Sequence, residues 1–255
     1  MASASQFYLD HIYAVSSGYR ATWDPDLPVR VGDLVKIDDY GVVNIQGSLT
    51  DKGIQPDVRI STTAMGLDYS SQRGIQVNIK AAGTVPVTGA LTNADAGFNI
   101  QFGSDKGVIF KLNGYKTQVI ANLGDIEAKV LALYRNQAWP DDLLIITNLI
   151  TADTSTIIIS DKGSASLDLK AKANINVADL DLTNASLGLS TVQKTGSIVQ
   201  FVATQGISPL YKVMGLRCSF LGMGSKHLDT RSLDAEKPEE QSIGLTLVEP
   251  EQFDF

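Results

Sequence analysis

The sequence predicts an α+β protein with a twisted, mostly antiparallel central sheet, long amphipathic hairpins, a few flanking helices and a short C-terminal tail. Three observations indicate this class. Apolar and polar residues alternate without a break over residues 165–177, which is the period of a half-buried strand. Residues 126–134 have the apolar spacing of a helix instead. After residue 224 the composition becomes polar and acidic.

The N-terminal quarter predicts short elements. Residues 7–15 carry apolar side chains near helical spacing and predict an amphipathic helix. Residues 29–37 and 42–49 predict a hairpin that turns through the polar segment between them, and residues 54–63 predict a weaker third strand.

The first clear strand signal follows residue 74. In residues 75–80 and 98–102, Ile, Val and Phe alternate with Gln, Asn and Lys, as in amphipathic strands. Residues 108–112 predict another strand. The intervening residues 103–107, Gly-Ser-Asp-Lys-Gly, have the composition of a tight turn and predict a hairpin between the flanking strands.

One long helix is expected between Asn122 and Trp139. Asn122 is a typical N-cap residue, and Asp125 and Glu127 place negative charge in the first turn, where the helix dipole favours it. The Trp139-Pro140 pair ends the helix, because proline cannot continue it.

Residues 156–160 predict a strand that turns through residues 161–163 into the long alternating segment 165–177. Thirteen alternating residues exceed the five or six of a typical strand. Leu180 and Leu182 then change phase, which predicts a bulge and a further strand.

Composition and charge exclude several classes of protein. The formal charge of −7 gives no basic surface for a phosphate backbone, so no nucleic-acid partner is expected. A single cysteine, Cys218, rules out an internal disulfide and is interpreted as a structural thiol. The N-terminus has no secretion signal, so the chain is expected to be cytoplasmic as made.

The sequence contains no pattern typical of catalysis or of metal binding. His11 and His227 lie in no motif, and we interpret them as surface residues. The carboxylate pair Asp38-Asp39 is interpreted as part of a turn. The sequence therefore predicts a protein that is not an enzyme, with no catalytic residue, no metal site and no cofactor.

The alternating segment 165–177 is compatible with two structures. One is a half-buried antiparallel strand with its polar face in water. The other is a strand that can cross a membrane, for which about 9–11 residues suffice, with an uncharged face toward lipid and a polar face toward water. Such strands leave no open edge in lipid, so crossing requires a closed barrel of several copies.

The chain resembles the bacterial gasdermins over residues 1–225. The resemblance is carried by the order of the expected elements and by three short segments: Val31-Gly32-Asp33-Leu34, residues 47–54 (Gly-Ser-Leu-Thr-Asp-Lys-Gly-Ile) and residues 206–211 (Gly-Ile-Ser-Pro-Leu-Tyr). The resemblance implies an autoinhibited pore-forming protein of antiphage defence. A protease, often caspase-like, removes its C-terminal tail, after which the body oligomerises, inserts two hairpins into the inner membrane and kills the cell.

By position, the inserting hairpins would be residues 75–112 and 156–203. The implied membrane-inserting residues are Ile75, Val77, Ile79, Phe98, Ile100, Phe102, Leu167, Leu169, Ile175 and Val177. The implied partners are the activating protease, membrane lipids after activation, and other copies of the chain in the pore. Several members of the family are palmitoylated on a cysteine near the N-terminus; residues 1–10 contain no cysteine, so no lipidation is expected.

The resemblance divides the chain into a pore-forming body (residues 1–224), a flexible linker with the cleavage site (225–240) and an autoinhibitory tail (241–255). The tail would dock through Ile243, Leu245, Leu247 and Phe253. An ordinary solvated terminus is the alternative for the tail. For the whole chain, the alternatives are a structural β-rich assembly protein and a lipid-carrying β protein.

Overall fold

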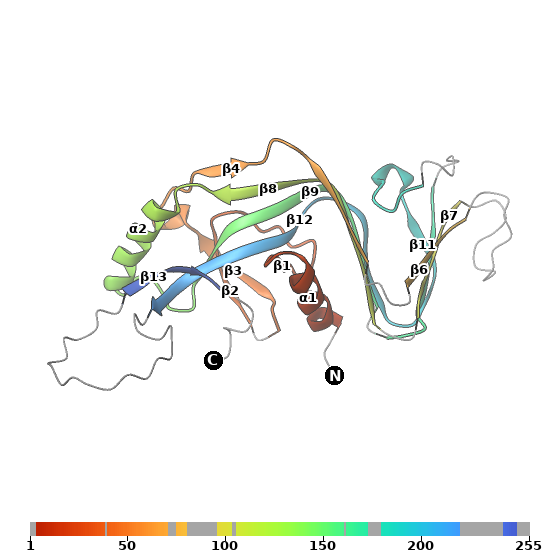
Figure 1. Ribbon diagram of the computed structural model, residues 1–255, viewed down its shortest axis with the longest axis horizontal. Helices are drawn as coiled ribbons and strands as arrows, with labels where there is room; N and C mark the ends of the chain where they lie inside the picture. Colours follow the sequence, from red (N-terminus) through yellow and green to blue (C-terminus); the bar gives the residue numbers. More distant parts are fainter. Residues whose placement is uncertain are drawn as a thin grey trace, which may run out of the picture.

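Two antiparallel β-sheets and two α-helices make up the described part of the protein, which confirms the predicted α+β class (Figure 1). The computed structural model describes residues 4–38, 40–70, 75–80, 96–103, 106–160, 162–172, 180–219 and 242–248. The helices are α1 (Ala4–Val15) and α2 (Leu123–Arg135), and the 3₁₀ turns are η1 (Thr50–Lys52) and η3 (Ala185–Leu187). The strands are β1 (Arg20–Ala21), β2 (Asp33–Ile37), β3 (Val43–Ser48), β4 (Val58–Ile60), β5 (Met65–Ser70), β6 (Ile75–Lys80), β7 (Gly97–Phe102), β8 (Gly107–Ile120), β9 (Leu144–Ser160), β10 (Ser166–Lys170), β11 (Ser190–Thr195), β12 (Ile198–Ser219) and β13 (Ser242–Leu247).

The larger sheet is built around β9. Strand β12 pairs with one edge of β9 along most of its length, while β8 and β2 share the other edge. The sequence predicted only residues 156–160 of β9 as a strand. Ile157, Ile158 and Ile159 have no exposed surface, because this part of β9 is covered on both faces. A strand buried on both faces is apolar throughout and loses the alternation that sequence patterns rely on.

The smaller sheet has the strand order β11-β10-β7-β6. Its inner strand β10 ends at Lys170. The predicted strand over residues 165–177 is therefore wrong for Ala171 and Lys172, which are described but lie outside the strand. The backbone N–H of Lys172 donates to the carbonyl of Leu187 at 2.9 Å, and the chain leaves the sheet there. Residues 173–177 of the predicted strand lie outside the described residues. Leu180 and Leu182 lie in a loop and not in the predicted strand.

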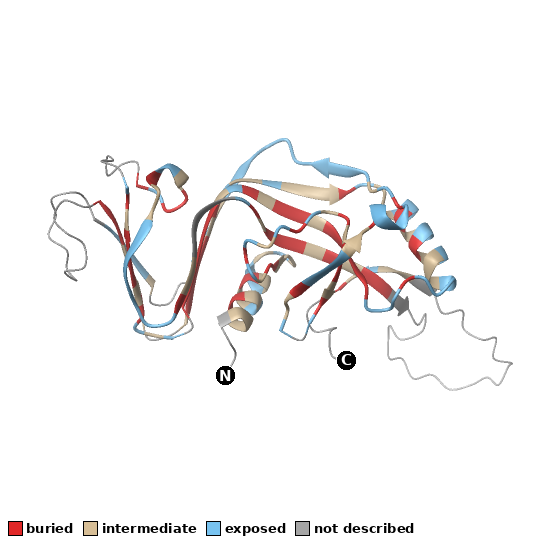
Figure 2. Cartoon of the chain, turned by 180° about the vertical axis from the view of Figure 1, so that it is seen from behind, coloured by how far each residue is buried: buried red, intermediate tan, exposed pale blue. Residues whose placement is uncertain are grey.

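The helices cover different parts of the larger sheet. Tyr8 and Ile12 of α1 are buried against β8 and β9, and Ile126 and Val130 of α2 are buried at the other end (Figure 2). Asn122 precedes α2 as predicted, but its side chain does not cap the helix. It accepts the N–H of Asp57, the residue before β4, at 2.7 Å instead. Neither helix in the described ranges is long and apolar enough to cross a membrane.

Candidate functional site

Four strands of the larger sheet continue into the smaller sheet in the same lateral order. The larger sheet contains the row β5-β8-β9-β12, and the smaller sheet contains the row β6-β7-β10-β11. Along the chain, β5 leads to β6, β7 to β8, β9 to β10 and β11 to β12. The two rows are therefore one four-stranded ribbon folded back on itself. We call the boundary between them the crease; it is the bottom of the U on the right of Figure 1.

Two turns that the sequence predicted as hairpins lie at the crease instead. Strand β7 pairs with β6 and β10, not with β8, and β9 does not pair with β10. The predicted hairpins at residues 103–107 and 161–163 are therefore wrong. Gly, Asp, Ser and Lys permit a reversal of the chain. They do not determine whether the reversal stays in the plane of one sheet or leads into a second one.

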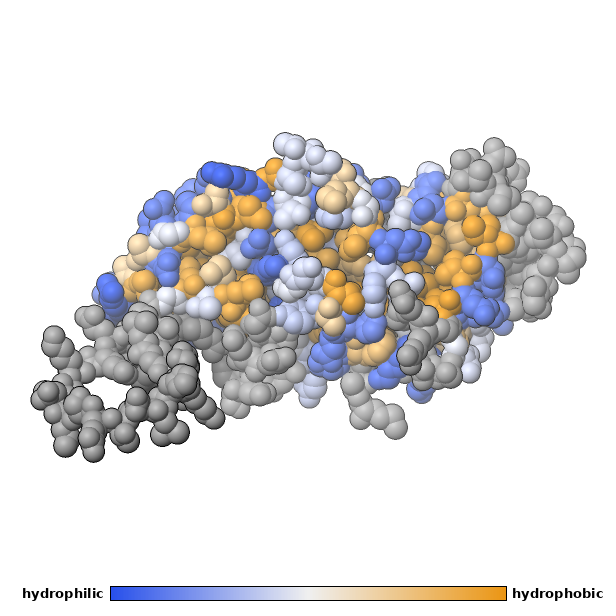
Figure 3. All heavy atoms as spheres, viewed as in Figure 1, coloured by the Kyte–Doolittle hydropathy of each residue, from blue (hydrophilic) through white to orange (hydrophobic). Residues whose placement is uncertain are grey.

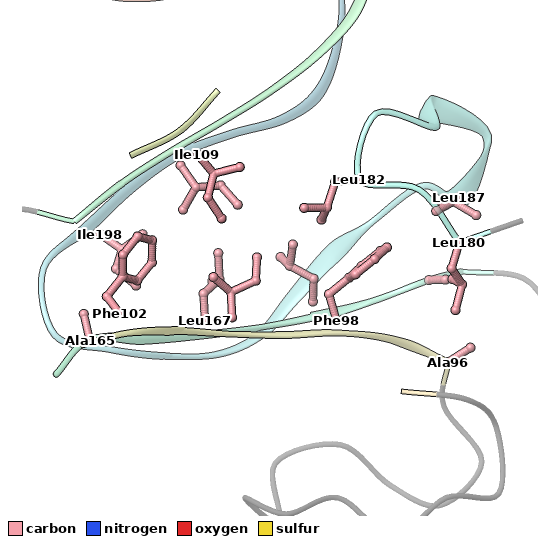
Figure 4. Packing of buried hydrophobic residues seen from close by; sticks show 14 residues of the cluster. Ala96, Phe98, Phe102, Ile109, Ala165, Leu167, Leu180, Leu182, Leu187 and Ile198 are labelled. Atoms are coloured by element: carbon pink, nitrogen blue, oxygen red, sulfur yellow. The ribbon is translucent and has the colours of Figure 1, made fainter. Parts of the chain in front are cut away.

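Most of the described residues predicted to insert into a membrane lie on the inner face of the folded ribbon. Figure 4 shows Phe98, Phe102 and Leu167 pointing toward the larger sheet. There they pack in one cluster with Ile109 and Ile158. The other buried predicted residues of this cluster are Ile100 and Leu169.

The predicted residues on edge strand β6 are less covered. Ile75 is partly buried, while Val77 and Ile79 are 42% and 52% exposed. They pair with Ile100 and Phe98, so they continue the inner face to its open edge. Figure 3 shows hydrophobic surface at this end of the molecule. Ile175 and Val177 lie outside the described residues.

The outer face of the smaller sheet is polar. Asn78, Asn99, Asp168 and Gln193 form one row across its four strands. The Asn99 side-chain amide donates to the Asp168 carboxylate at 2.5 Å, and Gln101 donates to Asn99 at 3.0 Å. The smaller sheet thus has one apolar and one hydrogen-bonded polar face.

The apolar faces on the two sides of the crease are in phase along the chain. On the larger sheet, α1 covers Val108 and Phe110 of β8 and Ile159 of β9. Phe102 precedes Val108 by six residues, and Ile159 precedes Leu167 by eight. Residues separated by an even number share one face of an uninterrupted strand.

The consecutive strands β5 and β6 follow the same phase across the crease. Tyr69 packs with the α1-covered cluster and precedes Ile75 by six residues. Within residues 66–80, 99–113 and 154–170, the opposite phase consists of polar residues and glycine, except for Ile109 and Ile158 in the core. Strand β11 departs from the pattern, because all six of its residues are exposed and five of them are polar.

A loop from the tip of the β10–β11 hairpin closes the open side of the U. Its residues Leu180, Leu182 and Leu187 are buried between the two sheets (Figure 4). The Thr156 hydroxyl of β9 donates to the Leu182 carbonyl at 2.5 Å. The loop contains the 3₁₀ turn η3, which is capped at both ends. The Asn184 side chain accepts the Ser186 N–H at its start, and Gly188 ends the turn with a left-handed backbone.

The C-terminal tail is a strand of the larger sheet. Strand β13 pairs antiparallel with β12, with Leu245 opposite Leu216 and Leu247 opposite Met214. Leu245 packs against the cluster under α2, and Leu247 is half-buried. The backbone of Ile243 pairs with Cys218. Phe253 and the predicted linker 225–240 lie outside the described residues.

Two residues of the body that hold the tail, Glu127 and Arg20, were not predicted from the sequence. The Glu127 carboxylate accepts the Leu245 N–H at 2.8 Å, and the Arg20 guanidinium donates to the Val248 carbonyl at 3.0 Å. Val248 itself is 2% exposed, in a cluster with Tyr211 and Val213. Burial lowers the pKa of Arg20. Arg20 and Val248 are 228 residues apart, so no local pattern indicates their contact.

Replacing Glu127 by alanine is expected to loosen the tail. A hydrogen bond to a charged acceptor is worth about 1.5–3 kcal/mol, so amide exchange in residues 242–248 should accelerate about 10- to 100-fold. Hydrogen–deuterium exchange with mass spectrometry measures this rate. Asp125→Ala is the matched control, because it removes an exposed carboxylate from the same helix turn. Equal acceleration in both variants would contradict the assigned role of Glu127.

Comparisons with known proteins give a remote similarity of fold. No family model matches the sequence, and no curated protein is similar to it. Among solved structures, a bacterial gasdermin from Bradyrhizobium tropiciagri matches with a TM-score of 0.34 and 13% sequence identity. The match covers 80% of this chain and 85% of that chain.

Proposed function

We propose that this chain is an autoinhibited pore-forming protein and not an enzyme. Proteolytic removal of the tail frees the edge of β12; the body then self-associates, and the ribbon opens at the crease to cross a membrane. The observation that carries the proposal is the phase of the strand faces. Opening the crease places two apolar faces in the same row, separated by polar residues such as Lys106. The face opposite this row is polar, as strands in lipid require.

The position of the tail supports its inhibitory role. Residues 214–219 of β12 pair with β13 along one edge, and Met214 also pairs with Ile145 of β9. Removal of β13 exposes a row of backbone donors and acceptors, which is a template for another strand. Because no sheet edge stays unpaired in lipid, insertion also requires a closed ring of copies.

The charge of the tail supports its removal as the activating step. Residues 229–255 contain eight acidic and two basic residues, so the chain without them has a formal charge of about −1 instead of −7. An anionic membrane surface repels the cleaved body less than the whole chain.

The biological setting is proposed from the sequence resemblance stated above. The chain is stored in the cytoplasm, the activating protease is caspase-like, and the pore forms in the inner membrane. Cell death in antiphage defence is the outcome. The lipid-carrying alternative requires an open apolar cavity, but Ile100, Leu167 and Leu187 of the inner face have no exposed surface.

A cleavable tail tests the proposal. The recognition sequence of a site-specific protease is placed within residues 229–237, and the protein is added to liposomes loaded with a self-quenching dye. We expect no release before the protease is added and release after it. The control is the unaltered chain with the same protease. A cleaved protein that stays soluble and releases no dye from anionic or neutral liposomes would refute the proposal and favour a structural assembly protein.

A further inference from the structure

The strands of the smaller sheet are too short to cross a membrane alone. Strands β6, β7 and β11 have six residues each, and β10 has five. Six residues span about 20 Å, whereas the hydrocarbon core of a bilayer is about 30 Å thick and a crossing strand needs about 9–11 residues. A ribbon that crosses the membrane therefore needs additional residues from one of its two ends.

The in-phase residues beyond the crease are apolar and lie under α1. Val108, Phe110 and Leu112 of β8 continue the phase of Phe102, and they are at most 2% exposed. They share a cluster with Tyr8 and Ile12 of α1, together with Ile157 and Ile159 of β9. With these positions, the in-phase row of β7–β8 runs from Phe98 to Leu112 and is apolar except at Ser104 and Lys106. This row exceeds the length that a crossing strand needs.

Specific contacts hold α1 on this face. His11 Nε2 and the Tyr69 hydroxyl of β5 are 2.6 Å apart. The Phe7 ring stacks on His11 at 5.3 Å, and the Lys106 ammonium lies 5.5 Å from the centre of the Phe7 ring. The His11–Tyr69 and Phe7–Lys106 contacts join α1 to the β5 and β7–β8 part of the ribbon, and the Phe7–His11 stacking lies within α1.

One buried polar group destabilises the packing of α1 on the sheet. The Tyr8 hydroxyl is buried and has no hydrogen-bond partner in the described part of the chain. A buried hydroxyl without a partner costs about 1–3 kcal/mol, and hydration regains this energy when α1 leaves. Apolar contacts hold the helix on the sheet, while the buried Tyr8 hydroxyl lowers the free energy needed to release it.

We infer that the face under α1 is the second part of the lipid-facing surface, and that its occupant in the membrane is lipid acyl chains. Helix α1 then restrains the folded form independently of the tail, and it must leave the sheet before the ribbon can cross. This inference rests on the proposed pore-forming function. The additional residues that each crossing strand needs then come from the larger sheet, beyond the crease, and not from the hairpin tips.

A reversible tether tests the inference in the protein with the cleavable tail. Cys218 is replaced by serine, and His11→Cys and Tyr69→Cys are joined by a bis-maleimide with a reducible linker as long as the two side chains that it replaces. The matched control carries the same linker between Gln6→Cys and Asp10→Cys, which face each other within α1. Dye release is measured after tail cleavage, before and after reduction.

The tethered protein is expected to release dye at least 10-fold more slowly than the control, and reduction should restore the rate. If the tethered protein released dye at the control rate before reduction, the inference would be overturned. The additional residues of the crossing strands would then come from the hairpin tips. Absence of release from the cleaved control would instead refute the proposed function itself. The two failures are therefore distinguishable.

Discussion

Replacing Ile79 by lysine should abolish dye release from liposomes while leaving the soluble protein folded. The side chain is 52% exposed, so the free energy of unfolding should change by no more than about 0.5 kcal/mol. In the membrane the same side chain belongs to the lipid-facing phase. A lysine there costs about 2–4 kcal/mol, which lowers insertion about 30- to 1,000-fold per copy. Val77→Lys should act in the same way.

The matched control is Asn78→Lys on the same strand. Asn78 is also exposed, but it lies on the opposite face, in the polar row with Asn99. The three variants add the same charge within three consecutive residues, so they differ only in the face that carries it. Thermal unfolding and dye release after tail cleavage are measured for each. Equal release from Ile79→Lys and Asn78→Lys would mean that the inner face does not meet lipid.

Truncating Leu187 to alanine should open the ribbon more easily. Leu187 has no exposed surface and packs between the two sheets. Loss of a buried leucine costs about 2–5 kcal/mol, which lowers the melting temperature of a chain of this size by about 5–15 °C. Because the lost contacts hold the loop inside the U, dye release after tail cleavage should accelerate at least 10-fold.

Leu143→Ala separates this effect from general destabilisation. Leu143 is 4% exposed and packs in the cluster under α2, which Leu187 does not join. Both variants should lose comparable stability by calorimetry, but only Leu187→Ala should release dye faster. Equal acceleration in both would mean that the loop is an ordinary part of the core and not a restraint on opening.

The sequence predicted the strand faces better than the connections between them. Alternation placed Phe98, Ile100 and Phe102 on one face, as the structure has them, because burial on one face leaves a local period of two. The crease was not predictable, since a turn composition does not specify which strands pair. The tail contact of Glu127 was missed because the sequence interpretation already explained this carboxylate by the helix dipole. In the structure, Asp125 is the acidic residue of the first turn.

The lateral order of the ribbon makes its two outer edges chemically different. Strand β6 presents alternating apolar residues at one edge, and β11 presents Ser, Thr, Gln and Lys at the other. Copies that join by these edges meet head to tail, and such contacts close into rings or extend into open arrays. Every array then has a direction and a growing end. A copy with one blocked edge would act as a chain terminator, so a small fraction of such copies would limit the size of every assembly in a mixture.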